Sequence, residues 1–191
     1  FVGAECRHVQ EHVGLLDMSA FAKCSVTGPN AESWLNGLVA NIVPKTVGRI
    51  GLCHMLSKNG GVRSEFTIYK RSQNNYYLVF AGAQERHDWD YLKKLAPSDG
   101  SVIMQKLTTQ IGVLVLAGPK SREVLQKLTD TDLGNDNFKW LSGKRIDIGY
   151  AQAEALRVNF IGELGWELHH PIEMQNYLFD LIKNSGDAFN L

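Results

Sequence analysis

A short pattern occurs twice in this sequence, and it restricts the possible folds more than any other feature. Gly28-Pro29 and Gly118-Pro119 each follow an apolar run with the composition of a strand, and they lie 118 − 28 = 90 residues apart. Proline suits the first turn of a helix, so each copy predicts a strand, a corner and a helix. The helically spaced residues that follow are Glu32, Leu35 and Leu38 in one copy and Arg122, Leu125 and Leu128 in the other. The repeat predicts two related α+β subdomains.

Helices and strands are expected along the rest of the chain. Helical spacing occurs at 3–13, 29–38, 84–95, 119–128 and 171–186. Strand-like runs occupy 21–26, 50–57, 62–69, 76–81, 102–107, 111–117, 144–148, 151–160 and 166–169, with a connector at 15–19. In the 84–95 helix, His87 and Asp88 are expected to face water. The breaker residues at 97–100 are expected to mark the subdomain boundary.

Short turns between neighbouring strands decide the expected fold class. They favour mixed or antiparallel sheets with helices, an α+β fold, over a doubly wound parallel sheet. Gly60 and Gly61 are expected to turn the chain between the strands at 50–57 and 62–69. In the second of these strands, Val62, Ser64, Phe66 and Ile68 share one face, and Arg63, Glu65, Thr67 and Tyr69 share the other. The first face can enter a core, whereas the second suits either open water or the wall of a polar pocket.

Composition excludes several classes of protein. The chain has 191 residues, and its 20 basic and 20 acidic residues cancel, so it lacks the basic field of a nucleic-acid or membrane-surface binder. No apolar run approaches the roughly 20 residues that cross a bilayer. The three cysteines have no CxxC spacing, which favours a reducing compartment over a disulfide framework. Since the chain opens on Phe1 and stops directly after a helix, we expect a piece of a longer protein.

Common catalytic fingerprints are missing. The sequence has no Gly-x-Gly-x-x-Gly, no Walker loop and no Gly-x-Ser-x-Gly elbow. His169 and His170 are neighbours on an expected strand and would point to opposite faces, so no metal site is expected.

Two carboxylates share a similar context. Glu65 follows the Gly-Gly turn, and Glu167 follows the loop that Gly162 and Gly165 bracket. A strand carboxylate beside a glycine loop can accept two parallel hydrogen bonds from a planar amidine-like edge, such as that of a pterin. Simple exposure of both residues is the alternative. Glu163, inside the loop, is expected to accept hydrogen bonds from nearby backbone amides.

These motifs resemble the folate-binding family of the glycine-cleavage T-protein, an aminomethyltransferase, across nearly the whole chain. More narrowly, the chain is similar to the folate domain of dimethylglycine and sarcosine dehydrogenases. The motifs that carry the resemblance are Leu16-Asp17-Met18-Ser19, Val26-Thr27-Gly28-Pro29, Ala40-Asn41-Ile42-Val43-Pro44-Lys45, His54-Met55-Leu56, the stretch from Asn59 to Tyr69, Leu116-Ala117-Gly118-Pro119 and the stretch from Phe160 to Leu168.

The resemblance implies a role for each candidate site residue. Glu65 stands where the family has an acid, usually Asp, beside the folate nitrogen that attacks the one-carbon unit. Glu167 stands where an acid holds the pterin edge, and Phe160 stands where an aromatic residue, usually Tyr, lines the same pocket. His54 and Glu163 are expected to contribute to the folate site. A family Asn after the next strand is replaced here by Ala81.

The resemblance also implies a function. An upstream flavin domain in the same protein would oxidise an N-methylated amine with FAD, and this chain would capture the product on tetrahydrofolate to give methylene-tetrahydrofolate. A downstream barrel domain is expected as well, and so is a mitochondrial matrix or bacterial cytoplasmic location. The alternative is a non-catalytic regulatory or structural module that resembles the regulatory subunit of pyruvate dehydrogenase phosphatase. The departures at Glu65, Phe160 and Ala81 point toward this alternative, whereas the two retained carboxylates point to a working folate site.

Overall fold

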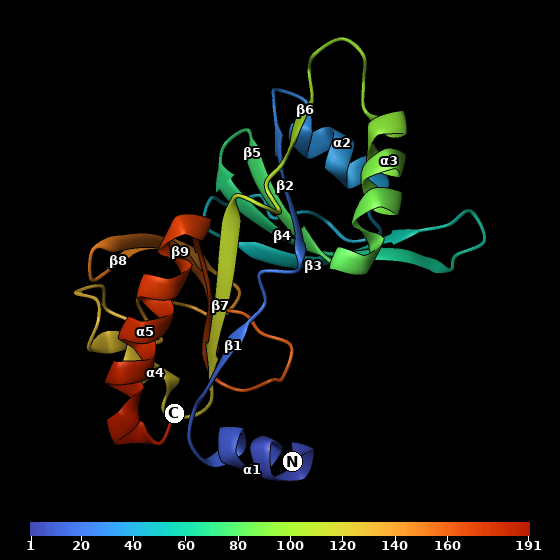
Figure 1. Cartoon of the computed structure of the whole chain (residues 1–191). Helices are drawn as coiled ribbons and strands as arrows, with labels where there is room; N and C mark the ends of the chain where they lie inside the picture. The colour runs from blue at the N-terminus through green and yellow to red at the C-terminus, as the bar shows by residue number, and fades with distance from the viewer. The chain divides into compact units, whose positions relative to one another are not determined.

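The computed structural model describes all residues from 1 to 191, and they form two units (Figure 1). We call Ala20–Thr108 the inserted unit, and Phe1–Ser19 together with Thr109–Leu191 the split unit. The expected boundary at 97–100 is wrong. The chain after Gly100 still belongs to the inserted unit because β6 (Ile103–Lys106) pairs there with β2 (Ala22–Thr27).

The inserted unit is a five-stranded antiparallel sheet with two helices. Its elements are β2, α2 (Ala31–Leu38), β3 (Ile50–Leu56), β4 (Val62–Ser72), β5 (Asn75–Phe80), the 3₁₀ turn η1 (Gly82–Gln84), α3 (Glu85–Leu95) and β6. The strand order is β3-β4-β5-β2-β6. The predicted hairpin is confirmed, with β3 paired to β4 in antiparallel register.

The helices α2 and α3 cover one face of this sheet. Leu35 of α2 and Leu92 of α3 join a buried core with Phe66 and Ile68 of β4, as the alternation predicted. The expectation that Asp88 faces water is wrong. Asp88 is fully buried, because its carboxylate accepts a hydrogen bond from Ser64 on the same face of β4. A polar residue on an inward helix position is tolerated when a partner meets it there.

The split unit repeats this architecture. Its elements are α1 (Val2–Glu11), β1 (Gly14–Asp17), β7 (Ile111–Ala117), α4 (Ser121–Gln126), β8 (Gly143–Ile148), β9 (Ala151–Leu156), β10 (Gly165–Pro171), η2 (Ile172–Met174), α5 (Gln175–Gly186) and η3 (Asp187–Phe189). The antiparallel strand order is β1-β7-β10-β9-β8. The expected connector at 15–19 is therefore a strand over most of its length. Its partner β7 lies almost 100 residues later, so no local pattern revealed the pairing.

The core of the split unit lies between its sheet and the helices α4 and α5. Leu125 of α4 and Leu178 of α5 pack there with Leu116, Trp166 and Leu168 of the two central strands. None of the helices in the chain combines the length and apolar composition needed to cross a membrane.

The two Gly-Pro corners have the same geometry, which confirms the repeat. Gly28 and Gly118 have φ angles of 123° and 129°, a region that side chains rarely adopt. A Cβ on Gly118 would lie 2.5 Å from the carbonyl oxygen of His12, and a Cβ on Gly28 would lie even closer to that of Ser101. Each corner needs glycine because the chain passes an adjacent backbone too closely for any side chain.

Candidate functional site

Glu65 forms a hydrogen-bonded pair with His54. The Nε2 atom of His54 lies 2.7 Å from Oε2 of Glu65, and the two residues are opposite each other in the β3–β4 register. The side chains are 37% and 51% exposed, so the pair is open to solvent and to a ligand. The other carboxylate oxygen of Glu65 makes no hydrogen bond within the chain, which leaves it available as an acceptor.

The pair lies on the sheet face that points away from α2 and α3. On this face Thr67 and Tyr69 are buried, whereas Glu65 is exposed, so the polar side of β4 is open only toward its start. Arg63 does not pair with Glu65. Its guanidinium contacts Nε2 of His87 at 3.0 Å and stacks 3.7 Å above the ring of Tyr91. The carboxylate of Glu65 therefore has histidine, and not arginine, as its partner.

Glu167 forms a similar pair in the split unit. Its Oε2 atom lies 3.1 Å from Nε2 of His169, and both side chains are almost fully buried. The neighbours Trp166 and Leu168 point into the helix-covered core, as the strand alternation predicted. Glu167 is therefore on the face away from α4 and α5, which is the same kind of face that carries Glu65.

The two adjacent histidines have different surroundings. His169 bonds Glu167, whereas His170 contacts the carbonyl oxygen of Leu168 and Oε1 of Gln175. Burial lowers the pKa of His170, and the hydrogen bonds to Leu168 and Gln175 oppose that shift only in part. His170 therefore fits a neutral, structural role.

The loop before β10 is held by Asn159. Its Oδ1 accepts hydrogen bonds from the amides of Ile161 and Gly162, and its Nδ2 donates to the carbonyl oxygen of Glu163. The expected role of the Glu163 side chain as the loop's acceptor is therefore wrong. The shorter Asn159 side chain reaches both amides, while Glu163 contributes through its backbone.

Phe160 belongs to the rim of an apolar cavity of about 700 Å³ within the split unit. The side chain of Phe160 is 59% exposed. The cavity is lined by Ala4, Glu5, His8, Val9, Val13, Gly14, Leu15, Leu16, Met18, Val115, Ala117, Asn159, Phe160, Ile161 and Leu191. Glu167 does not line it, but Val115 does, and Val115 is the residue opposite Glu167 in the β10–β7 register.

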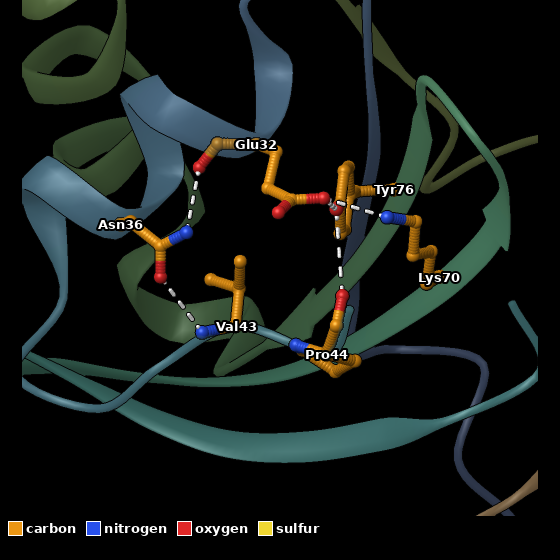
Figure 2. A network of polar contacts seen from close by, with 6 residues as sticks. All are labelled: Glu32, Asn36, Val43, Pro44, Lys70 and Tyr76. Carbon is orange, nitrogen blue, oxygen red and sulfur yellow. Dashed lines mark hydrogen bonds and ion pairs between the residues drawn. The ribbon is translucent and has the colours of Figure 1, made fainter. Parts of the chain in front are cut away.

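A polar network links α2 to β4 and β5 in the inserted unit (Figure 2). Oε2 of Glu32 lies 2.6 Å from the Lys70 ammonium and 2.6 Å from the Tyr76 hydroxyl. These two hydrogen bonds lower the pKa of Glu32. Burial alone would lower the pKa of Lys70, but its bonds to Glu32 and Tyr76 outweigh burial and raise it. The ion pair thus keeps both groups charged.

The predicted site residues fall into two groups. His54 and Glu65 are together in the inserted unit, and Phe160, Glu163 and Glu167 belong to the split unit. The sequence reasoning missed His169 and Asn159. His169 stands two residues after Glu167 on a strand, a spacing that places both on one face and could have revealed the pair. Asn159 carries no comparable signal.

The two buried cysteines are not candidate nucleophiles. Cys6 is exposed, and Cys24 and Cys53 are buried. Burial raises the pKa of Cys24 to about 12 and that of Cys53 to about 11, so both thiols stay protonated at neutral pH.

Proteins of known function resemble this chain along its whole length. Dimethylglycine dehydrogenase, mitochondrial, of Rattus norvegicus is 38% identical over 186 residues, covering 97% of this chain and 22% of that protein. The mitochondrial pyruvate dehydrogenase phosphatase regulatory subunit of Mus musculus is 28% identical, covering 100% of this chain and 22% of that protein. The chain therefore spans only about a fifth of the length of these relatives.

The fold is that of a known structure. The glycine cleavage system aminomethyltransferase T from Bartonella henselae matches with a TM-score of 0.80 and 22% identity, over 94% of this chain and 47% of that chain. The family model of the GCVT N-terminal domain matches residues 1–191. The chain belongs to the GCVT N-terminal domain family, and it is an aminomethyltransferase-like domain related to the dimethylglycine and sarcosine dehydrogenases.

Proposed function

We propose that this chain binds tetrahydrofolate and transfers a one-carbon unit to it, as a module of an enzyme of the dimethylglycine or sarcosine dehydrogenase type. One observation carries the proposal. Two strand carboxylates, Glu65 and Glu167, each follow a glycine turn, lie on the sheet face away from the helices and bond a histidine. Carboxylates held this way are suited to a cationic or hydrogen-bond-donating ligand.

The residues of the split unit fit a folate ring. A cavity of about 700 Å³ is within the range of small-molecule sites, and its apolar lining suits a flat ring. Phe160 offers an aromatic surface at its rim, although it lacks the hydroxyl of a tyrosine. Glu167 does not line this cavity but stands opposite Val115, which does. Its carboxylate is buried, so a hydrogen bond from a pterin N–H to it would form with little competition from water.

The two acids have different roles in this proposal. A flavin elsewhere in the protein would accept the hydride of the N-methylated amine, leaving a cationic iminium or, after hydrolysis, formaldehyde. Glu65 would stabilise the cation and accept the proton that the folate nitrogen loses as it forms its bond to the one-carbon unit. Glu167 would hold and orient the pterin edge. The proposal uses FAD only outside residues 1–191.

Isothermal titration with tetrahydrofolate tests the binding role. In the whole protein that contains this chain, Glu167→Ala should weaken binding roughly 10- to 100-fold, because a charge-assisted hydrogen bond contributes about 1.5–3 kcal/mol. Glu173→Ala, which removes an exposed acid of η2, is the matched control and should bind like wild type. Equal affinities for all three proteins would eliminate the pterin assignment.

Product analysis tests the chemical role. Glu65→Gln should leave amine oxidation intact and reduce methylene-tetrahydrofolate formation by about 10²- to 10⁴-fold, the usual contribution of a general base. Full product formation by this variant would remove Glu65 from the mechanism.

A regulatory module is the second candidate. The pyruvate dehydrogenase phosphatase regulatory subunit matches the chain over its full length, although at 28% rather than 38% identity. A wild-type protein that shows no binding of tetrahydrofolate in the same titration would favour this candidate.

The relatives support a proposal for the location. Several are named mitochondrial, and others are bacterial aminomethyltransferases. We infer a mitochondrial matrix or a bacterial cytoplasm, where a reducing milieu would keep the three cysteines as the free thiols that the structure contains.

A further inference from the structure

The backbone of β3 and β4 places His54 and Glu65 directly opposite each other. The amide of His54 points to Oδ1 of Asn41 at 3.4 Å, and its carbonyl oxygen accepts a hydrogen bond from the amide of Ala40 at 2.9 Å. Both backbone groups of His54 thus point away from β4. His54 and Glu65 are therefore a non-hydrogen-bonded cross-strand pair, the kind whose side chains approach most closely.

A segment that we call the strap, residues 39–44, makes these contacts. It follows α2 and runs beside β3, the edge strand of the sheet, where Val39 forms an isolated bridge with Met55. The strap therefore supplies hydrogen bonds to an edge that would otherwise be unpaired. Through Ala40 and Asn41, it determines where the His54 backbone lies.

The polar network of Figure 2 holds the strap at its far end. Oδ1 of Asn36 accepts a hydrogen bond from the amide of Val43 at 3.0 Å, and its Nδ2 donates to the carbonyl of Glu32 at 3.1 Å. The Tyr76 hydroxyl lies 3.4 Å from the Pro44 carbonyl oxygen. The side chain of Lys70 is only 5% exposed, whereas that of Glu32 is 38% exposed, so the anchor is shielded from water on its Lys70 side.

We propose that His54 is a positioning residue for Glu65, held in place by the strap, and that it acts on one-carbon transfer without contacting folate; this inference rests on the proposed function. The Nε2 atom of His54 bonds one oxygen of Glu65 and leaves the other toward the ligand. A glutamate has one more rotatable bond than an aspartate, so an exposed Glu65 needs a second group to define its position. His54 supplies that group.

Two substitutions of His54 separate positioning from folate contact. His54→Leu removes the hydrogen bond and keeps an apolar side chain, whereas His54→Gln keeps an N–H that can reach Glu65. In the whole protein, His54→Leu should lower the kcat for methylene-tetrahydrofolate formation about 10- to 100-fold, the usual effect of a misplaced catalytic group. The Kd for tetrahydrofolate should stay within about 2-fold of wild type, and His54→Gln should recover most of the lost rate.

A second variant tests the strap. Asn41→Ala removes the acceptor for the His54 amide and leaves His54 itself intact. It should lower the same kcat by a smaller factor, about 3- to 10-fold, with an unchanged Kd. A wild-type rate in this variant would exclude the strap from the positioning of Glu65.

The outcomes distinguish this inference from the proposed function. If wild type does not bind tetrahydrofolate, the proposed function itself fails. If wild type binds, Glu65→Gln loses transfer and His54→Leu transfers at the wild-type rate, the function stands and the positioning role is overturned. An equal rise in Kd for His54→Leu and His54→Gln would identify His54 as a folate contact instead.

Discussion

The inserted unit runs β2, α2, β3, β4, β5, α3 and β6, and the split unit runs β7, α4, β8, β9, β10 and α5. The sheet orders β3-β4-β5-β2-β6 and β8-β9-β10-β7-β1 then match strand for strand. The split unit also has α1, which has no counterpart in the inserted unit, and the two sheets differ in the origin of their last strand. In the inserted unit β6 follows α3 directly, whereas in the split unit the equivalent place is filled by β1, from the start of the chain. One architecture is thus built twice, once continuously and once with a strand contributed from a distance.

The correspondence extends to individual hydrogen bonds. In the inserted unit the Asn36 side chain accepts from the amide of Val43 at 3.0 Å, and in the split unit the Gln126 side chain accepts from the amide of Leu133 at 3.1 Å. Asn36 and Gln126 are 126 − 36 = 90 positions apart, and Val43 and Leu133 are also 133 − 43 = 90 positions apart. Each unit therefore ties the helix that follows its Gly-Pro corner to the segment after that helix by an amide side chain.

The charges around this shared tie differ between the units. The inserted unit has an ion pair beside a tyrosine: Glu32, Lys70 and Tyr76. The equivalent positions of the split unit hold two arginines beside a tryptophan: Arg122, Arg157 and Trp166. Both arginines donate to Oδ1 of Asn135, a neutral acceptor. Burial, and then the charge of Arg122, lowers the pKa of Arg157. The same geometry is thus compatible with attraction in one unit and repulsion in the other.

The candidate acids are not equivalent to each other. Gly165 pairs with Ala117 as Asn75 pairs with Thr27, and Ala117 and Thr27 are 117 − 27 = 90 positions apart. Glu167, two residues after Gly165, therefore corresponds to Tyr77, two residues after Asn75 in β5. Tyr69 pairs with Tyr77, and Leu156 pairs with Glu167, so Tyr69 corresponds to Leu156. Four residues earlier in each strand, Glu65 therefore corresponds to Gln152 of β9. Each unit therefore adds one acid of its own to a common scaffold, which suits two acids with different roles.

The largest expected effect tests the equivalence of the corners. Gly28→Ala and Gly118→Ala should each lower the free energy of unfolding by at least about 3 kcal/mol, because a Cβ meets a backbone carbonyl at a positive φ. Urea denaturation measures the loss, and hydrogen exchange should show reduced protection in the sheet that contains the substitution.

A helical glycine gives the matched control for these two variants. Gly37 lies in α2, and a Cβ there would meet no atom within 4 Å. Gly37→Ala should be neutral or stabilising by up to about 1 kcal/mol. If only one corner is intolerant of alanine, the two corners are not equivalent.

The next effect separates the ion pair from the arginine pair. Lys70→Met should cost about 1–2 kcal/mol, because Glu32 loses its cation but keeps the Tyr76 hydroxyl. Arg157→Met should cost less than about 1 kcal/mol, because the relief of repulsion from Arg122 offsets the lost hydrogen bonds. Chemical denaturation of both variants compares the two costs, and a larger cost for Arg157→Met would contradict the electrostatic contrast.

The pH dependence of stability provides an independent test of the same ion pair. The folded-state pKa of Glu32 lies below its ordinary value of 4.5, so the pair stabilises the fold fully above that pH. The stabilisation is lost as the pH falls through the lowered pKa. Denaturation between pH 6 and about pH 3 should therefore show a shallower loss of stability for Lys70→Met than for wild type. Parallel curves would mean that Lys70 does not shift the pKa of Glu32.

The last prediction concerns the shared amide tie. Asn36→Ala and Gln126→Ala should each cost about 1 kcal/mol, the usual contribution of a hydrogen bond to a backbone amide. Equal costs in denaturant titrations would support equivalent roles in the two units. A loss above about 3 kcal/mol for Asn36→Ala would show that the strap contributes more to the stability of the inserted unit than the equivalent segment contributes to that of the split unit.

Local patterns predicted most of the fold. The Gly-Pro corners, the β3–β4 hairpin and the alternation that buries Phe66, Ile68, Trp166 and Leu168 all depend on a few neighbouring residues, and the structure confirms them. The candidate site was predicted less completely. Glu65 and Glu167 were identified from turns and alternation, and His54 was named as a site residue, but His169 and the pairing of each acid with a histidine were not predicted, and Glu163 was given the role of Asn159.

The sequence by itself determined the repeat, the fold class and the strand faces, because glycine conformation, proline geometry and side-chain alternation act within a few residues. Only the tertiary structure decided that β1 pairs with β7 and that β6 belongs to the inserted unit. It alone buried Asp88 against Ser64 and placed His54 opposite Glu65. These arrangements depend on contacts between residues from 11 to about 100 positions apart. Their free energy comes from pairing and burial, which a local pattern does not contain.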